Sequence, residues 1–230
     1  MIGNFVILEL IVIVGITILK DCMEENSSDR DRRVSRQFIK QEYGGIPELF
    51  YSHSTKAPFE HCISCDRALQ APNTQYLVEK AFRNYPEFET TDVIFEYAMC
   101  LNCADQMRKE LSLSSLSRIQ EFFENRVNFH LRRDQLMQSD SLNAPAWLKN
   151  CLITGEAQPS LEEYQIYGHF VDNRCVYSFL PYMISGSAVD EITNLLSEKT
   201  LGEIDRFIDE NFGLPPELKK PIRDNPIIFV

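Results

Sequence analysis

Two closely spaced cysteine pairs constrain this chain more than any other feature of its sequence. The first pair is Cys62 and Cys65, the second is Cys100 and Cys103, and residues 66–99 lie between them. In a C-x-x-C arrangement, one tight turn lets both sulfur atoms reach the same ion. Two such pairs supply four thiolates, the ligand set of a tetrahedral site. The sequence therefore predicts that the two segments fold onto one metal ion.

The segments around the pairs predict how the site is built. Aromatic and β-branched residues indicate strands at 74–82 and 93–99, and Pro86 interrupts the pattern between them. After the second pair, Met107 and Leu111 lie four residues apart, which is the spacing of one helix face. The predicted order is therefore a cysteine pair, a β-hairpin, and a second pair at the start of a helix.

This order of elements resembles the treble-clef class of zinc fingers over residues 59–112. The resemblance implies one structural zinc ion held by all four cysteines of the two pairs. A helix that begins at the second pair would also direct free N–H groups and a partial positive charge toward the thiolates. We expect His61 and Arg67 to lie beside the ligands, where each can approach a sulfur atom.

Other readings of the cysteines compete with structural zinc. A strand, a C-x-x-C pair and a helix in succession also form a thioredoxin-like redox site, in which Cys100 and Cys103 would act as a dithiol. Two C-x-x-C pairs hold iron in a rubredoxin, although its knuckles are usually rich in glycine. A nucleic-acid-binding finger would use the basic segment 30–40, but the net charge of −11 disfavours phosphate binding.

The C-terminal part of the sequence repeats the theme of the first part. Residues 110–125 align without a gap with residues 195–210, and "CISCDRAL" lines up with "CLITGEAQ", which starts at Cys151. The sequence therefore predicts an internal duplication, in which residues 151–212 are a degenerate copy of residues 62–127. The positions predicted to replace the four ligands are Cys151, Thr154, Ile184 and Ser187, of which only the first is a thiol.

The second unit has its own predicted elements. Alternating apolar residues indicate strands at 163–171 and 175–184, and helical spacing indicates helices at 187–196 and 201–211. Thr200 and Glu203 have the spacing of a capping box at the start of the last helix. In the first unit, Ser115 or Ser117 is the predicted cap of the helix that carries Ile119 and Phe123.

The N-terminal segment admits two main interpretations. Residues 1–22 include the apolar run Phe5–Leu19, which Glu9 interrupts and which is shorter than the roughly 20 residues of a spanning helix. Either translation starts at Met23, or this segment anchors the protein in a membrane. The predicted division of the chain is an apolar segment 1–22, a polar arm 23–57, a zinc unit 58–133, a connector 134–150, a degenerate repeat 151–213 and a tail 214–230.

Taken together, these features predict an α+β protein with two treble-clef-like units, one with zinc and one without. Four thiolates leave no open position for water or substrate, so we expect a non-enzymatic protein that acts as a protein-interaction or scaffold module. Protein is the expected partner, and a membrane is one only if residues 1–22 belong to the protein. The odd number of cysteines favours a reducing compartment, for which we expect the cytoplasm.

Overall fold

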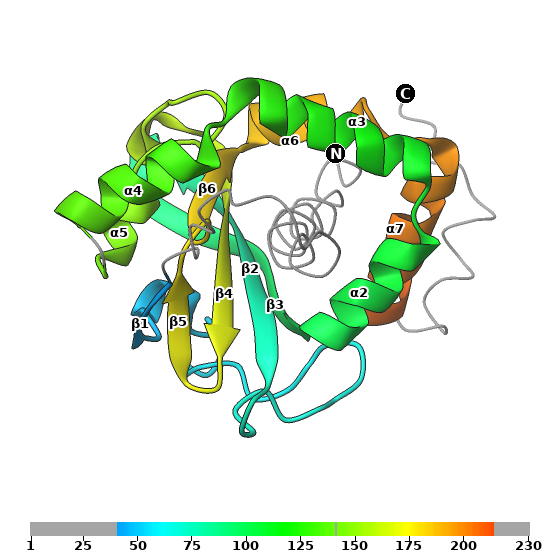
Figure 1. Cartoon of the computed structure of the whole chain (residues 1–230), viewed down its shortest axis with the longest axis horizontal. Helices are drawn as coiled ribbons and strands as arrows, with labels where there is room; N and C mark the ends of the chain where they lie inside the picture. The colour runs from blue at the N-terminus through cyan, green and yellow to red at the C-terminus, as the bar shows by residue number, and fades with distance from the viewer. Residues whose placement is uncertain (1–40, 141, 214–230) are drawn as a thin grey trace, which may run out of the picture.

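The computed structural model describes residues 41–140 and 142–213 and combines a β-sheet with α-helices (Figure 1). The mixed α and β content predicted from the sequence is therefore confirmed. The six-stranded antiparallel sheet has the order β1-β5-β4-β2-β3, and β6 also pairs with β4. The strands are β1 (Glu42–Gly45), β2 (Gln75–Tyr85), β3 (Thr90–Cys100), β4 (Glu163–Val171), β5 (Arg174–Tyr177) and β6 (Tyr182–Ser185). The helices are α2 (Leu101–Glu110), α3 (Leu113–Arg126), α4 (Phe129–Ser139), α5 (Ala144–Trp147), α6 (Gly186–Thr193) and α7 (Glu198–Asn211).

The centre of the sheet joins the two halves of the chain. Strand β2 forms a hairpin with β3 and pairs on its other side with β4, from Gln75 opposite Val171 to Arg83 opposite Glu163. Both strands are long and rich in aromatic and aliphatic residues, which favour a pleated and buried backbone. The two predicted units therefore share one sheet.

The two faces of the sheet are covered by different parts of the chain. On one face, the ring of Phe170 packs edge-on against Phe50 and stacks on Tyr76. Gly168 permits this approach, because a Cβ atom there would lie 2.8 Å from the Phe50 ring. On the other face, Tyr97 of β3 packs against Phe207 of α7. Figure 1 shows α3, α7 and α2 following one another in an arc beside the sheet.

The N-termini of helices α3 and α7 lie side by side, and residues of the two N-termini hydrogen-bond to each other. Ser112 caps α3 by accepting from the Ser115 amide at 3.1 Å, and Ser197 caps α7 by accepting from the Thr200 amide at 3.3 Å. The Ser112 amide donates to Thr200 Oγ1 at 3.1 Å, and the Ser197 amide donates to Ser115 Oγ at 2.9 Å. The two cap hydroxyls are 2.8 Å apart. We call these four residues the cap cluster.

Substitution Ser197→Ala is expected to lower the free energy of unfolding by about 2 kcal/mol, since it removes a helix cap and leaves a partly buried network incomplete. Denaturant unfolding measures this change. A double-mutant cycle with Ser112→Ala should give a coupling of about 1 kcal/mol, because the two hydroxyls contact each other. Ser117→Ala, at an exposed position of α3, is the control and should be nearly neutral. If the losses of unfolding free energy in the two single variants simply add in the double variant, the proposed coupling between the two cap residues is wrong.

The structure corrects the predicted caps. The capping box at Thr200 and Glu203 is wrong, since Ser197 is the cap and Thr200 lies within the first turn. Neither Ser115 nor Ser117 caps α3, because Ser112 does so. Both errors place the helix start at least three residues too late, since another hydroxyl residue follows the true cap within the first turn of each helix.

Strand and helix boundaries also differ in two places. The predicted strand 175–184 is two strands, β5 and β6, with a break at residues 178–181. Pro181 has no N–H group to donate to a neighbouring strand, so the ladder cannot run through it. The connector predicted at 134–150 contains the end of α4 and all of α5. Trp147 of α5 is 1% exposed and anchors this segment in the core.

The predictions for residues 1–22 lie outside the described residues, as do those for 23–40 and 214–230. Within 41–140 and 142–213, no helix has both the length and the apolar character needed to cross a membrane. Of the predicted polar arm, residues 42–45 form β1, which pairs with β5 at one edge of the sheet.

Candidate metal centre

The four cysteines of the two pairs come together in the structure. One sulfur atom from each of Cys62, Cys65, Cys100 and Cys103 lies within 4.8 Å of every other. The Sγ atoms of Cys65 and Cys100 are 3.8 Å apart, far beyond the 2.05 Å of a disulfide bond. Sulfur ligands at 2.3 Å from a tetrahedral zinc ion are about 3.8 Å from one another. The arrangement is therefore compatible with a four-cysteine metal site.

The first pair lies on a tight turn that precedes the sheet. The Cys62 amide donates to the Arg67 carbonyl at 2.9 Å, and the Asp66 amide donates to the Cys62 carbonyl at 2.9 Å. Asp66 adopts a left-handed backbone with φ of 56°, a conformation that aspartate tolerates better than most residues. The Ile63 amide donates to the Ala98 carbonyl at 2.9 Å, which fastens the turn to the edge of β3.

The second pair lies at the junction of β3 and α2. Cys100 is the last residue of β3 and the N-cap of α2, and Cys103 lies in the first turn of that helix. The Cys100 amide donates to the Cys62 sulfur at 3.3 Å. The unpaired N–H groups at a helix start favour negative charge, so this junction stabilises thiolates. The hairpin thus returns the chain to the turn and aligns the two pairs.

The pKa values of Cys62, Cys100 and Cys103 are shifted by burial and by the close approach of the other sulfur atoms. Burial alone would raise the pKa of Cys62, but amide donors, first among them that of Cys100, outweigh it and lower the pKa. Burial raises the pKa of Cys100, and burial together with the neighbouring sulfur atoms raises that of Cys103 further. Four thiolates this close repel one another, and a divalent cation at their centre would offset that repulsion.

The two residues predicted to lie beside the ligands belong to the segment that carries the first cysteine pair. The exposed His61 ring places Nδ1 3.0 Å from the Asp66 carbonyl oxygen, and this hydrogen bond raises the pKa of the imidazole. The Arg67 side chain is exposed, and its carbonyl accepts from the Cys62 amide. Both residues make hydrogen bonds within the turn that carries Cys62 and Cys65.

The later segment has a junction of the same kind, and it corrects the predicted ligand replacements. Ser185 ends β6 and caps α6, as Cys100 ends β3 and caps α2. The residues at the junction are therefore Ser185 and Ala188, one position beyond the predicted Ile184 and Ser187. The predicted replacements pair Cys100 with Ile184 at an offset of 84 residues, whereas Ser185 and Ala188 lie 85 residues after Cys100 and Cys103, the same offset that relates residues 110–125 to residues 195–210.

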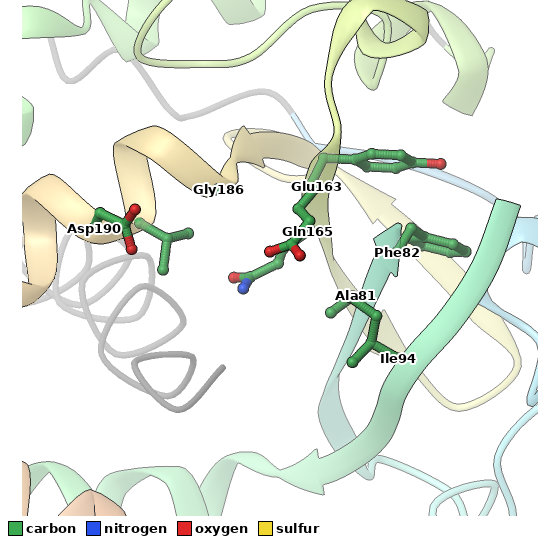
Figure 2. Close-up of a pocket in the computed structure, with 9 residues that line it drawn as sticks. Ala81, Phe82, Ile94, Glu163, Gln165, Gly186 and Asp190 are labelled. Atoms are coloured by element: carbon green, nitrogen blue, oxygen red, sulfur yellow. The ribbon is translucent and has the colours of Figure 1, made fainter. Parts of the chain in front are cut away.

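A small hollow lies between the sheet and α6 (Figure 2). Its lining includes Ala81 of β2, Gln165 of β4 and Asp190 of α6. Figure 2 shows the side chains of Gln165 and Asp190 on facing sides of this hollow. Its volume is about 50 Å³, whereas sites for small molecules usually enclose about 300 Å³ or more. This hollow is too small to hold a cofactor or substrate of ordinary size.

The cluster of four cysteines could thus be predicted from the sequence, but the hydrogen bonds that orient it could not. The Cys100 amide that donates to Cys62 belongs to a residue far away in the sequence, and no local pattern announces such a contact. No protein-family model, curated protein or solved structure matches this chain, so the candidate metal centre is assigned from its own geometry and chemistry.

Proposed function

We propose that the protein holds one structural zinc ion between Cys62, Cys65, Cys100 and Cys103. The observation that supports this most directly is the convergence of four sulfur atoms within 4.8 Å. Four soft, negatively charged ligands in a tetrahedral arrangement suit zinc, and their number leaves no open position for catalysis. The order of knuckle, hairpin and helix around the site supports the proposal of a treble-clef-like finger.

The convergence of sulfur atoms also argues against a redox role for the second pair. A thioredoxin-like dithiol consists of two sulfur atoms beside a helix start, with a resting state free to form a disulfide. Here the Cys65 sulfur is 3.8 Å from the Cys100 sulfur, and all four sulfur atoms lie within 4.8 Å of one another. Binding to one ion accounts for all four positions, whereas a redox pair accounts for two.

We further propose that the zinc unit stabilises a protein-binding module that works in a reducing compartment such as the cytoplasm, where thiolates persist as ligands. The closed ligand set supports a binding role over catalysis at the metal, because it leaves no open position for a substrate. The net charge of −11 favours a protein partner over a nucleic acid.

Metal analysis tests the zinc site. Protein purified under reducing conditions should contain one equivalent of zinc by mass spectrometry, and Cys100→Ser should lose most of it. Cys175→Ser is the matched control, because Cys175 is a buried thiol that lies outside the sulfur cluster. Less than half an equivalent in the wild type, or full retention in Cys100→Ser, would sink the proposal.

Thiol labelling distinguishes zinc binding from redox chemistry. Cys65 is exposed, so without metal it should react with an alkylating reagent at once. With zinc bound, the four ligands should react only after a chelator is added, and Cys151 and Cys175 should stay protected for as long as zinc is bound, because they are buried in the folded protein. Immediate labelling of Cys100 and Cys103 in the native protein would favour the dithiol instead.

The binding role needs its own experiment. Affinity capture from a cell extract with the full chain should recover specific proteins, and Cys62→Ser should fail to recover them, whereas Cys175→Ser should behave as the wild type does. Equal recovery by all three proteins would show that the zinc unit does not support binding.

A further inference from the structure

We infer that the C-terminal half contains the scaffold of a second four-ligand metal site, in which hydrogen bonds centred on Cys151 have taken the place of the ion. The inference rests on the proposed zinc site of the first half. The four positions of this scaffold are Cys151, Thr154, Ser185 and Ala188, and we call them the vacated site.

The turn that carries Cys151 matches the turn that carries Cys62. The Cys151 amide donates to the Glu156 carbonyl at 2.8 Å, as the Cys62 amide donates to the Arg67 carbonyl at 2.9 Å. The Gly155 amide donates to the Cys151 carbonyl at 2.9 Å, and Gly155 has a left-handed backbone with φ of 75°. These are the contacts and the conformation of Asp66 in the first turn.

Each turn is fastened to the sheet in the same way. The Leu152 amide donates to the Met183 carbonyl of β6 at 2.8 Å, whereas in the first half the Ile63 amide donates to the Ala98 carbonyl of β3 at 2.9 Å. An isolated antiparallel bridge closes each turn as well. These bridges join His61 to Ala68 and Asn150 to Ala157.

The strand–helix junctions complete the correspondence. The Ser185 amide donates to the Cys151 sulfur at 3.2 Å, as the Cys100 amide donates to the Cys62 sulfur at 3.3 Å. The Ala188 amide donates to the Ser185 hydroxyl at 3.4 Å. Ala188 therefore occupies the helix position of Cys103 in the first half. The match extends to atoms on both sides of the site, which a chance similarity of amphipathic helices would not produce.

Neutral hydrogen bonds connect the groups that an ion would otherwise hold. The Cys151 sulfur contacts the Ser185 hydroxyl at 3.3 Å and accepts from the Thr154 amide at 3.4 Å. Cys151 is 3% exposed, Ser185 1% and Ala188 0%, whereas Thr154 is exposed, as Cys65 is in the first half. Four thiolates this close together would need a cation, whereas one thiol, two hydroxyls and a methyl group do not. Without three of the four thiols, the second site needs no metal ion, and its backbone retains the conformation of the first site.

The way the halves meet supports one common scaffold. The β2–β4 ladder runs antiparallel at the centre of the sheet, so the strand that follows each turn pairs with its counterpart. In the cap cluster, Ser112 and Ser197 make the same bonds to each other's helices. Two units of one design, related by an approximate two-fold rotation, produce this reciprocity.

The test is to restore the ligands in the full chain. The variant Thr154→Cys/Ser185→Cys/Ala188→Cys is expected to bind two equivalents of zinc, and its cobalt-loaded form should show twice the thiolate-to-metal absorbance of the cobalt-loaded wild type. Adding Cys151→Ser to this variant is the matched control and should return the content to one equivalent. One equivalent in a folded variant would overturn the inference. A wild type without zinc would instead overturn the proposed function on which it rests.

If the first variant fails to fold, the inference can be tested by the opposite set of substitutions, made in the first site. Cys65→Thr/Cys100→Ser/Cys103→Ala gives the first site the side chains of the vacated site. This variant is expected to stay folded in excess chelator, as judged by circular dichroism, and to contain no zinc. Cys103→Ala alone, which leaves three crowded thiols, should unfold under the same conditions. Equal unfolding of the two variants in chelator would refute the replacement of zinc by hydrogen bonds.

Discussion

Chelation of zinc is expected to abolish the cooperative thermal unfolding transition of the full chain. Structural zinc contributes about 10–16 kcal/mol in zinc-finger peptides, which equals or exceeds the roughly 5–15 kcal/mol that stabilises a typical domain. The loss of stability would spread beyond the metal site, because β3 ends at Cys100 and pairs with β2, which in turn pairs with β4. Circular dichroism melts with and without excess chelator measure the effect.

Hydrogen exchange can show where the loss begins. Amides of the first turn, Cys62 to Leu69, and of α2 should lose protection first, while the turn at Cys151 should keep its protection longer because its bonds need no ion. The control is the same chelator already saturated with zinc, which should change neither measurement. Unchanged melts in protein shown to be free of zinc would contradict a structural role for the metal.

The four-cysteine cluster could be predicted because each of its C-x-x-C pairs is local in the sequence. A C-x-x-C turn requires only four adjacent residues, and each pair here stands beside a strand that the alternation of apolar residues reveals. The strand predicted at 163–171 coincides with β4 for the same reason, since most of its residues are buried and aromatic or β-branched. Residue type and spacing suffice where one short segment decides the structure.

The sequence was a poorer guide wherever distant contacts decide the structure. Residues 42–45 look like part of a polar arm, yet they form β1 because β5 offers an open edge, and the Arg174 guanidinium lies 4.8 Å from the Tyr43 ring. Helix α4 packs on the core through Phe129, Leu136 and Met137, and it is also held through Arg132, which donates to the carbonyls of Trp147 and Pro181. Such bonds depend on where the sheet has already placed their acceptors.

The reciprocal caps show a third kind of limit. Each of Ser112 and Ser197 could be suspected as a cap from local sequence, but the contact between them joins segments that are far apart in the chain. Alignment of residues 110–125 with residues 195–210 brought the two serines to equivalent positions. Similarity alone does not say that equivalent residues touch, and it is the antiparallel β2–β4 pairing that brings them together.

Acid is expected to destabilise the protein through His169 between pH 6.5 and about 4. Burial lowers the pKa of this imidazole from its ordinary 6.5 to about 4. The ring is 6% exposed, its Nε2 lies 3.1 Å from the Gln75 amide oxygen, and its Nδ1 has no hydrogen-bond partner among the described residues. Within this window the unfolded chain is protonated while the folded protein stays neutral, so the free energy of unfolding falls as pH falls.

The size of the effect follows from the shift in pKa. A pKa lowered from 6.5 to about 4 corresponds to a loss of about 3 kcal/mol, which is nearly reached at pH 4, complete below it and absent above about pH 7. His169→Gln keeps a polar side chain near Gln75 but cannot take up a proton, so its free energy of unfolding should fall less over this range. Urea unfolding at several pH values with zinc in excess measures the difference, and His53→Gln, at an exposed position, is the control that should follow the wild type. Parallel decline of His169→Gln and wild type from pH 7 to pH 4 would rule out this histidine as the source, because thiolate protonation is common to both proteins and cancels in the comparison.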